Sequence, residues 1–173
     1  MKKKANALVN IFMGSDSDYP VMEEAVNILK QFGVEYEVHV SSAHRSPERT
    51  RRLIKKAERE GVQVFIAGAG AAAHLAGVIA AETIIPVIGV PIGSSPLNGL
   101  DALLSTAQMP GGISVASMAI GKAGAKNAGV LAVQIIALSD KGLTSKLKRY
   151  KTDLAKEVER KSKKLNLMNA KKI

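Results

Sequence analysis

Short apolar segments alternate with longer amphipathic segments along most of the chain. Runs of mostly apolar residues predict strands at 7–12, 35–40, 62–67, 86–90 and 114–120. Apolar residues that recur every three or four positions predict helices at 18–32, 46–60, 74–82, 100–106, 124–138 and 143–165. The strands lack the alternation of a half-exposed sheet, which is typical of parallel strands covered on both faces. The pattern predicts an α/β fold in which a central parallel sheet lies between two layers of helices.

Polar, glycine-rich segments follow four of the predicted strands. Their sequences are MGSDSD (13–18), SSAHRSP (41–47), AGAGAAAH (67–74) and GVPIGSS (89–95). Ligands of open α/β sheets bind outside the carboxyl ends of the strands. We therefore expect the four segments to meet in one crevice, which is the predicted functional site.

The segment 41–47 carries an adjacent histidine and arginine, His44 and Arg45, on a predicted strand-to-helix turn. An imidazole takes up and releases a proton near neutral pH. A guanidinium presents a planar fork to a phosphate or a carboxylate. The two side chains together suit proton transfer on a bound anion, and a surface loop beside a basic helix is the alternative.

The segment 13–18 combines a glycine with Ser15, Ser17 and Asp18 where a helix is predicted to begin. Free N–H groups at a helix start bind phosphate, and the serine hydroxyls add further donors. The Asp18 carboxylate suits a ribose better than a phosphate, because it accepts hydrogen bonds from hydroxyl groups. Ordinary helix capping is the alternative.

The segment 67–74 has only a superficial likeness to the dinucleotide-binding fingerprint. Gly68, Gly70 and Ala73 fit G-x-G-x-x-A, but Glu82 comes too early for the acidic residue of that motif. The glycines are better explained by a close approach of backbone to a small ligand. His74 is a candidate for the same crevice, with a structural role as an equal alternative, whereas His39 lies inside a strand and is expected to be structural.

Net charge and length favour one domain with a basic end. The chain has 173 residues and a formal net charge of +10, and all of the excess lies in the first four residues and after residue 138. We expect a single domain, 1–173, with a core at 7–138 and an oligomer-docking helix and basic tail at 139–173, its end fraying after Lys163. Aromatic residues make up 3% and no nucleic-acid-binding module is visible, so no nucleic-acid partner is expected.

Several other partners are not expected. The chain has no cysteine and three histidines on separate segments, which argues against a zinc site. No apolar stretch has the length and continuity of a membrane span. A cytoplasmic protein without a membrane partner is the resulting prediction.

Two helices are predicted to need an apolar partner. The segment 121–138 has few charged residues and is apolar nearly all round, which favours burial between subunits. The segment 143–165 places Leu143, Leu147, Tyr150 and Leu154 on one stripe, which continues to Leu165. Both patterns predict a homo-oligomer.

Five segments, in order along the chain, carry a family resemblance: MGSDSD, SSAHRSPER, AGAGAAAHLAGVIAAET, PVIGVPIGSSPLNGLDALLSTAQMP and AIGKAGAKNAGVLAVQIIAL. They resemble the N5-carboxyaminoimidazole ribonucleotide mutase (PurE) family of purine biosynthesis over about residues 8–150. The AGAG segment is similar to that of the mutases rather than to that of related enzymes that carboxylate aminoimidazole ribonucleotide with CO2. The resemblance implies a three-layer flavodoxin-like fold, a homo-octamer with C-terminal helices on neighbouring subunits, and no cofactor or metal.

The resemblance also implies roles for individual residues. His44 matches the catalytic general acid/base, which protonates the departing nitrogen and later helps to remove the C4 proton. Ser15, Asp18 and Arg45 match ribonucleotide-binding positions, with Asp18 on the ribose and the other two on the phosphate. The remaining substrate-binding positions are Ser42, Ala69, Gly70, His74 and Leu75, around the carboxylate and the trapped CO2.

Three rival functions stay open from the sequence. A carboxylase of the same fold would use free CO2. A non-catalytic module would bind the ribonucleotide without turnover. A nucleic-acid binder would depend on residues 151–173 and would lose affinity steeply with salt.

Overall fold

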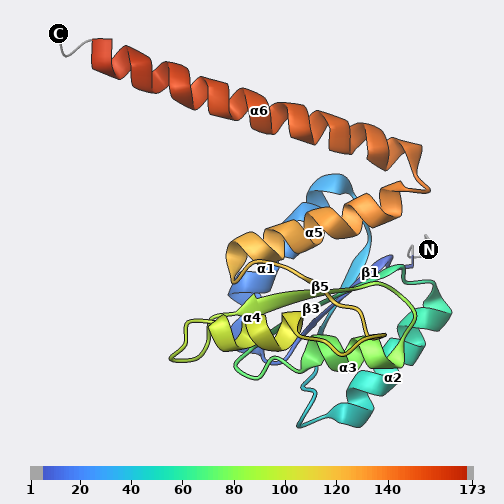
Figure 1. Cartoon of the computed structure of the whole chain (residues 1–173). Helices are drawn as coiled ribbons and strands as arrows, with labels where there is room; N and C mark the ends of the chain where they lie inside the picture. Colours follow the sequence, from blue (N-terminus) through green and yellow to red (C-terminus); the bar gives the residue numbers. More distant parts are fainter. Residues whose placement is uncertain (1–5, 171–173) are drawn as a thin grey trace. The chain divides into compact units, whose positions relative to one another are not determined.

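The computed structural model describes the backbone of residues 6–170 and the side chains of 6–166. The elements in chain order are β1 (Val9–Met13), a 3-10 turn η1 (Asp16–Asp18), α1 (Tyr19–Phe32), β2 (Tyr36–Val40), α2 (Pro47–Glu60), β3 (Val64–Gly70), α3 (Leu75–Glu82), β4 (Val87–Ile92), α4 (Leu100–Ala107), β5 (Ala116–Ser117), α5 (Lys122–Ala137) and α6 (Lys141–Ala170) (Figure 1). They form two compact units, the first ending at Ile135 and the second beginning at Ile136.

The first unit is built on a five-stranded sheet in which every pairing is parallel. The strand order is β2-β1-β3-β4-β5, the order of a flavodoxin-like sheet. The chain runs outward in opposite directions from β1 and β3, so the switch point of the sheet lies between these two neighbouring strands. The predicted parallel α/β fold is confirmed.

Helices cover both faces of this sheet (Figure 1). On one face, α1 packs on β3 through Met22, which lies against Gly68. On the other face, α2 and α3 enclose the main apolar cluster with β1, β3 and β4. The members of this cluster are Phe12, Ile54, Ala57, Val62, Phe65, Ala67, Leu75, Ala76, Ile79 and Val87. The three-layer prediction is therefore confirmed for the first unit.

The helix boundaries follow the predicted local signals. Pro20 and Pro47 lie in the first turns of α1 and α2, where the missing N–H costs nothing. Both helices end at a glycine in the left-handed conformation, Gly33 and Gly61. The local sequence thus fixes where each of these two helices begins and ends.

Two strand predictions were wrong in extent by three residues or more. β3 continues to Gly70, beyond the predicted end at residue 67, because its parallel register with β4 extends through the pair Gly70 and Ile92. β5 holds only Ala116 and Ser117 instead of 114–120. The Met118 N–H still bonds the Gly89 carbonyl (2.9 Å), but the next ladder bond would need an N–H on Pro91, which proline lacks.

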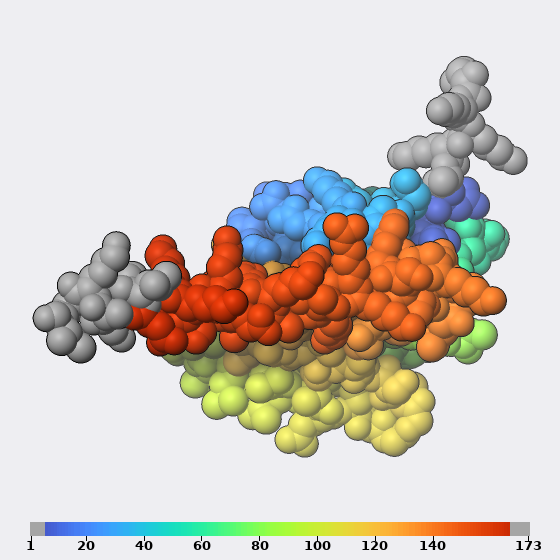
Figure 2. Space-filling model, turned by 90° about the horizontal axis from the view of Figure 1, so that it is seen from above, coloured from blue at the N-terminus to red at the C-terminus, as the bar shows by residue number. Residues whose placement is uncertain are grey.

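The second unit is dominated by α6, a single helix that extends past the predicted fraying point at Lys163 to Ala170. In the space-filling view its side chains form one continuous orange-to-red band (Figure 2). Leu154, Val158 and Leu165 are 39%, 68% and 60% exposed in the isolated chain. Among the helices of residues 6–170, none combines the length and the hydrophobicity needed to cross a bilayer.

α5 is less enclosed than its composition predicts. Ala125, Ala128 and Ala132 are fully buried, and Gly129 lies against Ala25 and Ile28 of α1. The opposite side, including Lys126, Asn127 and Gln134, is exposed. Within one chain, α5 therefore buries a single face.

Replacing Gly124 with alanine should destabilise the fold. A Cβ there would lie 2.6 Å from the carbonyl carbon of Ala119 and still closer to its oxygen, and backbone cannot move aside as a flexible side chain can. Overpacking of this kind costs about 2–3 kcal/mol, more than the helix propensity of about 1 kcal/mol that alanine gains. The net cost of about 1–2 kcal/mol should lower the melting temperature by roughly 2–8 °C. The matched variant G111A, with open space at the Cβ position, should melt like wild type, and equal melting of both variants would contradict the packing argument.

Candidate active site

One cavity of about 410 Å3 lies at the carboxyl ends of β1 to β4. Its volume is in the range of small-molecule sites. The lining residues are Gly14, Ser15, Ser17, Asp18, Ser42, Ala43, His44, Ala69, Gly70, Ala71, Ala72, Ala73, His74, Leu75 and Ser94. The four polar segments predicted to converge therefore do meet, and they contribute all of these residues except Leu75, which directly follows one of them.

His44 and His74 are in direct contact across this cavity. Their ring nitrogens Nε2 of His44 and Nδ1 of His74 are 2.6 Å apart. The rings are nearly perpendicular, with centroids 4.8 Å apart and an angle of 81° between planes. This pairing joins the turns after β2 and β3, 30 residues apart in sequence.

The contact restricts the protonation states of the pair. A hydrogen bond between two ring nitrogens requires one N–H and one lone pair. Two imidazolium rings would direct an N–H at each other and would lose the bond. The intact pair therefore carries at most one extra proton, and the nitrogens that face away from the contact are available to a ligand.

Four serine contacts fix the turn that carries His44. The Ser42 N–H donates to Ser46 Oγ (3.0 Å), and that hydroxyl donates back to the Ser42 carbonyl (3.1 Å). The Arg45 N–H donates to Ser42 Oγ (3.2 Å). Beneath them, Ser41 Oγ and Thr50 Oγ1 are 2.8 Å apart and buried. The turn is thus held by its own side chains, and the bond from the Ser41 N–H to the Met13 carbonyl (2.9 Å) ties its start to β1.

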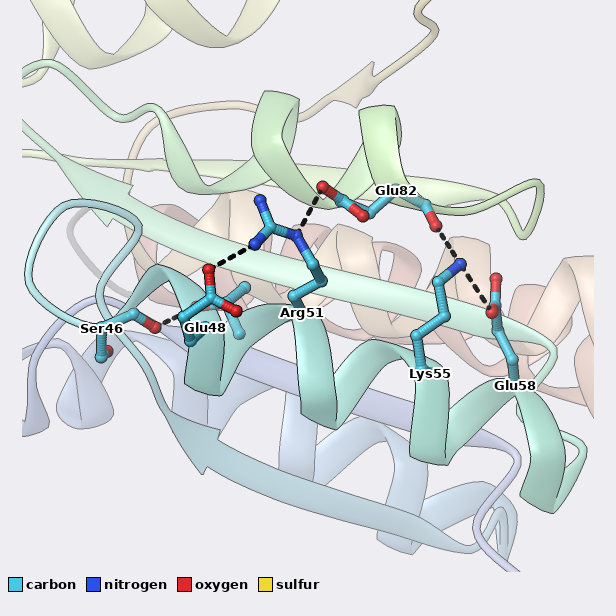
Figure 3. Close-up of polar contacts among 7 residues, drawn as sticks. Ser46, Glu48, Arg51, Lys55, Glu58 and Glu82 are labelled. Carbon is cyan, nitrogen blue, oxygen red and sulfur yellow. Dashed lines mark hydrogen bonds and ion pairs between the residues drawn. The ribbon is translucent and has the colours of Figure 1, made fainter.

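A polar network ties together the helices that follow the two histidine turns (Figure 3). Arg51 of α2 bonds Glu82 of α3 at 3.0 Å. Lys55 of α2 donates to the Glu82 carbonyl (2.8 Å) and to Glu58 (3.1 Å). Glu58 in turn accepts from Thr83 Oγ1 (2.6 Å). Exposed pairs are worth little one by one, but together they fix the register of α2 against α3.

Asp18 is the buried carboxyl group of the site, only 7% exposed. It forms a capping box with Ser15, whose N–H donates to Asp18 Oδ2 (3.1 Å). Burial raises the pKa of Asp18, and the backbone N–H bonds from Ser15 and Gly14 partly oppose this effect. A buried carboxylate of this kind is prepared to accept further hydrogen bonds.

Replacing Asp18 with asparagine should stabilise the free protein at pH 7. The raised pKa means that the folded state favours the neutral carboxyl group of Asp18. The contribution of Asp18 to folding stability is therefore complete at pH values below its pKa in the unfolded chain. This contribution is lost as the pH rises through its higher pKa in the folded protein. Asparagine keeps the acceptor and never ionises. Thermal melting should show the gain at pH 7 and little gain below about pH 4. Asp16→Asn, on the exposed neighbour, is the matched control, and a less stable D18N protein at pH 7 would contradict the prediction.

Arg45 is the one predicted site residue that does not line the cavity. Its guanidinium lies at the rim, with Nη2 3.5 Å from the carbonyl oxygen of Gly14. This contact is long for a hydrogen bond. The exposed side chain can therefore leave it to meet an anion that extends from the cavity.

The wall formed by 71–73 has an unusual backbone. Ala71 and Ala73 have positive φ angles of 51° and 44°, a conformation that costs a residue with a Cβ about 1 kcal/mol or more. Strain of this kind accumulates at functional sites. It turns the chain from the end of β3 around the cavity to His74.

The sequence did not single out every residue of the cavity. Ala43, Ala71 and Ala72 carry no chemical signal, and only the fold places their backbone here. Ser94 belonged to a segment expected at the crevice, but nothing in the sequence distinguished it from Ser95. Among the described residues, no cluster of three or more histidines and carboxylates could hold a metal ion.

Known proteins match the chain over nearly all of its length. An N5-carboxyaminoimidazole ribonucleotide mutase of Pyrococcus horikoshii is 55% identical over 166 residues, which cover 96% of this chain and 93% of the relative. The mutase of Bacillus subtilis is 54% identical over 140 residues, or 81% and 86% of the two chains. The crystal structure of Treponema denticola PurE has a TM-score of 0.83 and 32% identity, covering 92% of this chain and 98% of that one.

The sequence match also extends to a whole family. Residues 8–157 match the family described as AIR carboxylase. This range includes the sheet, all five helices of the first unit, every residue of the cavity and the first half of α6. The chain belongs to the AIR carboxylase family.

Proposed function

We propose that the chain is a mutase of purine biosynthesis that converts N5-carboxyaminoimidazole ribonucleotide to 4-carboxy-5-aminoimidazole ribonucleotide at the cavity. The observation that carries the proposal is the convergence of His44, Asp18 and the backbone of residues 69–73 on one cavity. Relatives that share more than half of the residues bear the name of this mutase.

The proposed substrate extends across the cavity from the ends of β1 and β2 toward the ends of β3 and β4. Arg45 and Ser15, after β2 and β1, bind the phosphate, because a guanidinium and a hydroxyl are both donors to it. Asp18 accepts hydrogen bonds from the ribose hydroxyls. Around the imidazole ring and its migrating carboxylate are Ser42, Ala69, Gly70, His74 and Leu75.

The proposed chemistry has two steps with His44 as general acid and then base. The bond from the exocyclic nitrogen to the carboxylate breaks, its electron pair remains on nitrogen, and the His44 imidazolium gives that nitrogen a proton. The trapped CO2 is then attacked by C4, which forms the new carbon–carbon bond. Neutral His44 removes the C4 proton and regains its starting state, so the reaction is an isomerisation. His74, bonded to His44, holds the ring in orientation.

A two-substrate assay tests this function. We expect rapid product formation from N5-carboxyaminoimidazole ribonucleotide without added bicarbonate, followed by absorbance. The family description, AIR carboxylase, supports a second candidate that adds CO2 directly to aminoimidazole ribonucleotide. Product only from aminoimidazole ribonucleotide with CO2 would establish that candidate, and binding without any product would leave a ribonucleotide-binding module.

We also propose a homo-octamer in which α6 lies on neighbouring subunits. The support is the exposed apolar stripe of α6 and the apolar composition of α5. Deletion of the chain from Leu143 onward should lower the assembly state, because it removes this stripe. Light scattering measures the mass directly, and an unchanged mass per particle would rule out α6 as the docking element.

A cytoplasmic location completes the proposal, with the ribonucleotide and further copies of the chain as partners. The chain has no cysteine and therefore gains nothing from an oxidising compartment. The basic residues are concentrated on α6 rather than around the cavity, so we assign no nucleic-acid partner to the site.

A further inference from the structure

Ser94 occupies the space that a side chain at position 70 would need. A Cβ on Gly70 would overlap the Ser94 hydroxyl and would lie 2.9 Å from Ser94 Cβ and 3.0 Å from the Ile92 carbonyl oxygen. Gly70 and Ile92 are paired in the sheet, so the ends of β3 and β4 hold the two residues together. The glycine at position 70 thus allows a serine hydroxyl to lie against its backbone.

The local backbone fixes the Ser94 hydroxyl at the cavity wall. The Ser94 N–H bonds the Ile92 carbonyl (3.0 Å), which closes a tight turn directly after β4. Both Ser94 and Gly70 line the cavity. Within residues 6–166 the Ser94 hydroxyl makes no hydrogen bond, whereas Ser95 Oγ accepts from the Leu97 N–H (3.2 Å). Ser94 therefore has a donor available at the cavity, whereas Ser95 does not line it.

The strand order assigns Ser94 to one end of the cavity. Arg45 follows β2 and reaches Gly14 after β1, which makes the β1–β2 end cationic. Gly70 and Ser94 follow β3 and β4 and form a small, uncharged end. A ribonucleotide whose phosphate meets Arg45 directs its base toward the Gly70–Ser94 end.

We propose that Ser94 is a further substrate-binding residue, whose hydroxyl donates a hydrogen bond to the migrating carboxylate beside Gly70. This inference rests on the proposed function. A neutral donor suits a group that must lose its charge and leave as CO2. A cation at the same place would stabilise the carboxylate more than the transition state, in which that charge is moving to nitrogen, and would slow the step.

Ligand binding to Ser94→Ala tests the contact without requiring turnover. We expect the affinity for 4-carboxy-5-aminoimidazole ribonucleotide to fall by about 10- to 100-fold, the usual effect of a hydrogen bond to a charged group. Affinity for aminoimidazole ribonucleotide, which lacks the carboxylate, should not change. The matched variant Ser95→Ala should bind both ribonucleotides like wild type. Calorimetry measures the affinities of wild type and both variants for the two ribonucleotides.

Each outcome bears on a different claim. If Ser94→Ala weakens both ribonucleotides equally, or neither, the carboxylate contact is overturned while the proposed function stands. A wild-type chain that binds neither ribonucleotide would overturn the function and the contact with it.

Gly70→Ala should also weaken the binding of the carboxylated ribonucleotide only. The double variant G70A/S94G should recover part of the melting temperature, because the overlap with Ser94 is removed while the 3.0 Å contact with the Ile92 carbonyl oxygen remains. It should not recover that affinity, and recovery of the affinity would also overturn the role of the hydroxyl.

Discussion

The variant H44N should bind ribonucleotide as tightly as wild type and turn it over about 10²–10⁴ times more slowly, the usual contribution of a positioned general acid/base. Asparagine is close in size to the part of the imidazole nearest the backbone, but it is too short to replace Nε2, the atom that contacts His74. It cannot give a proton to the departing nitrogen or take one from C4. Calorimetry on H44N measures the affinity, and single-turnover kinetics measure the rate of the chemical step.

H74N is the matched control for this variant. It removes the imidazole that contacts His44 at 2.6 Å but leaves the proposed acid/base in place. We expect a smaller loss of kcat than in H44N, because His74 orients the ring and does not itself transfer the proton. Equal losses in both variants would mean that the pair acts as one unit, and retained activity in H44N would remove His44 from the catalytic role.

The variant R45E should weaken ribonucleotide binding by about 2–4 kcal/mol, or roughly 30- to 1000-fold. It removes a charge-assisted partner of the phosphate and places a like charge at the rim. The long contact of Arg45 with Gly14 (3.5 Å) contributes little to folding, so the melting temperature should hardly change. The affinity should be compared by calorimetry at fixed ionic strength.

Arg52→Glu makes the same change of charge on exposed α2, away from the cavity lining. A loss that followed net charge alone would appear equally in R52E and R45E. We expect R52E to bind like wild type at moderate salt, because salt screens an exposed charge that does not line the cavity. Unchanged affinity in R45E would disprove the phosphate assignment.

The sheet and the position of the cavity could be predicted because both depend on local pattern. Continuous apolar runs predict buried parallel strands, and the carboxyl-end rule then selects the polar loops. Gly33 and Gly61 ended helices where predicted. The length of β5 could not be predicted from its own residues, since it depends on the missing N–H of Pro91 in the neighbouring strand.

The contacts within the site depend on tertiary structure and could not be predicted from the local sequence pattern. Nothing near His44 indicates that its partner is His74, 30 positions later. The left-handed Ala71 and Ala73 occur where sequence rules expect glycine. Gly70 was predicted to allow a close approach to a ligand, but local pattern did not indicate that Ser94 packs against its backbone. Such pairs are set by how β3 and β4 end side by side.

A label-retention experiment tests the mutase function most directly. N5-carboxyaminoimidazole ribonucleotide with 13C in its carboxylate is incubated with the enzyme in excess unlabelled bicarbonate, and the product is analysed by mass spectrometry. If the carboxylate is transferred within the cavity without exchange, the product keeps the label at every bicarbonate concentration. Unlabelled product would show that free CO2 is the carbon source and would contradict the mutase function.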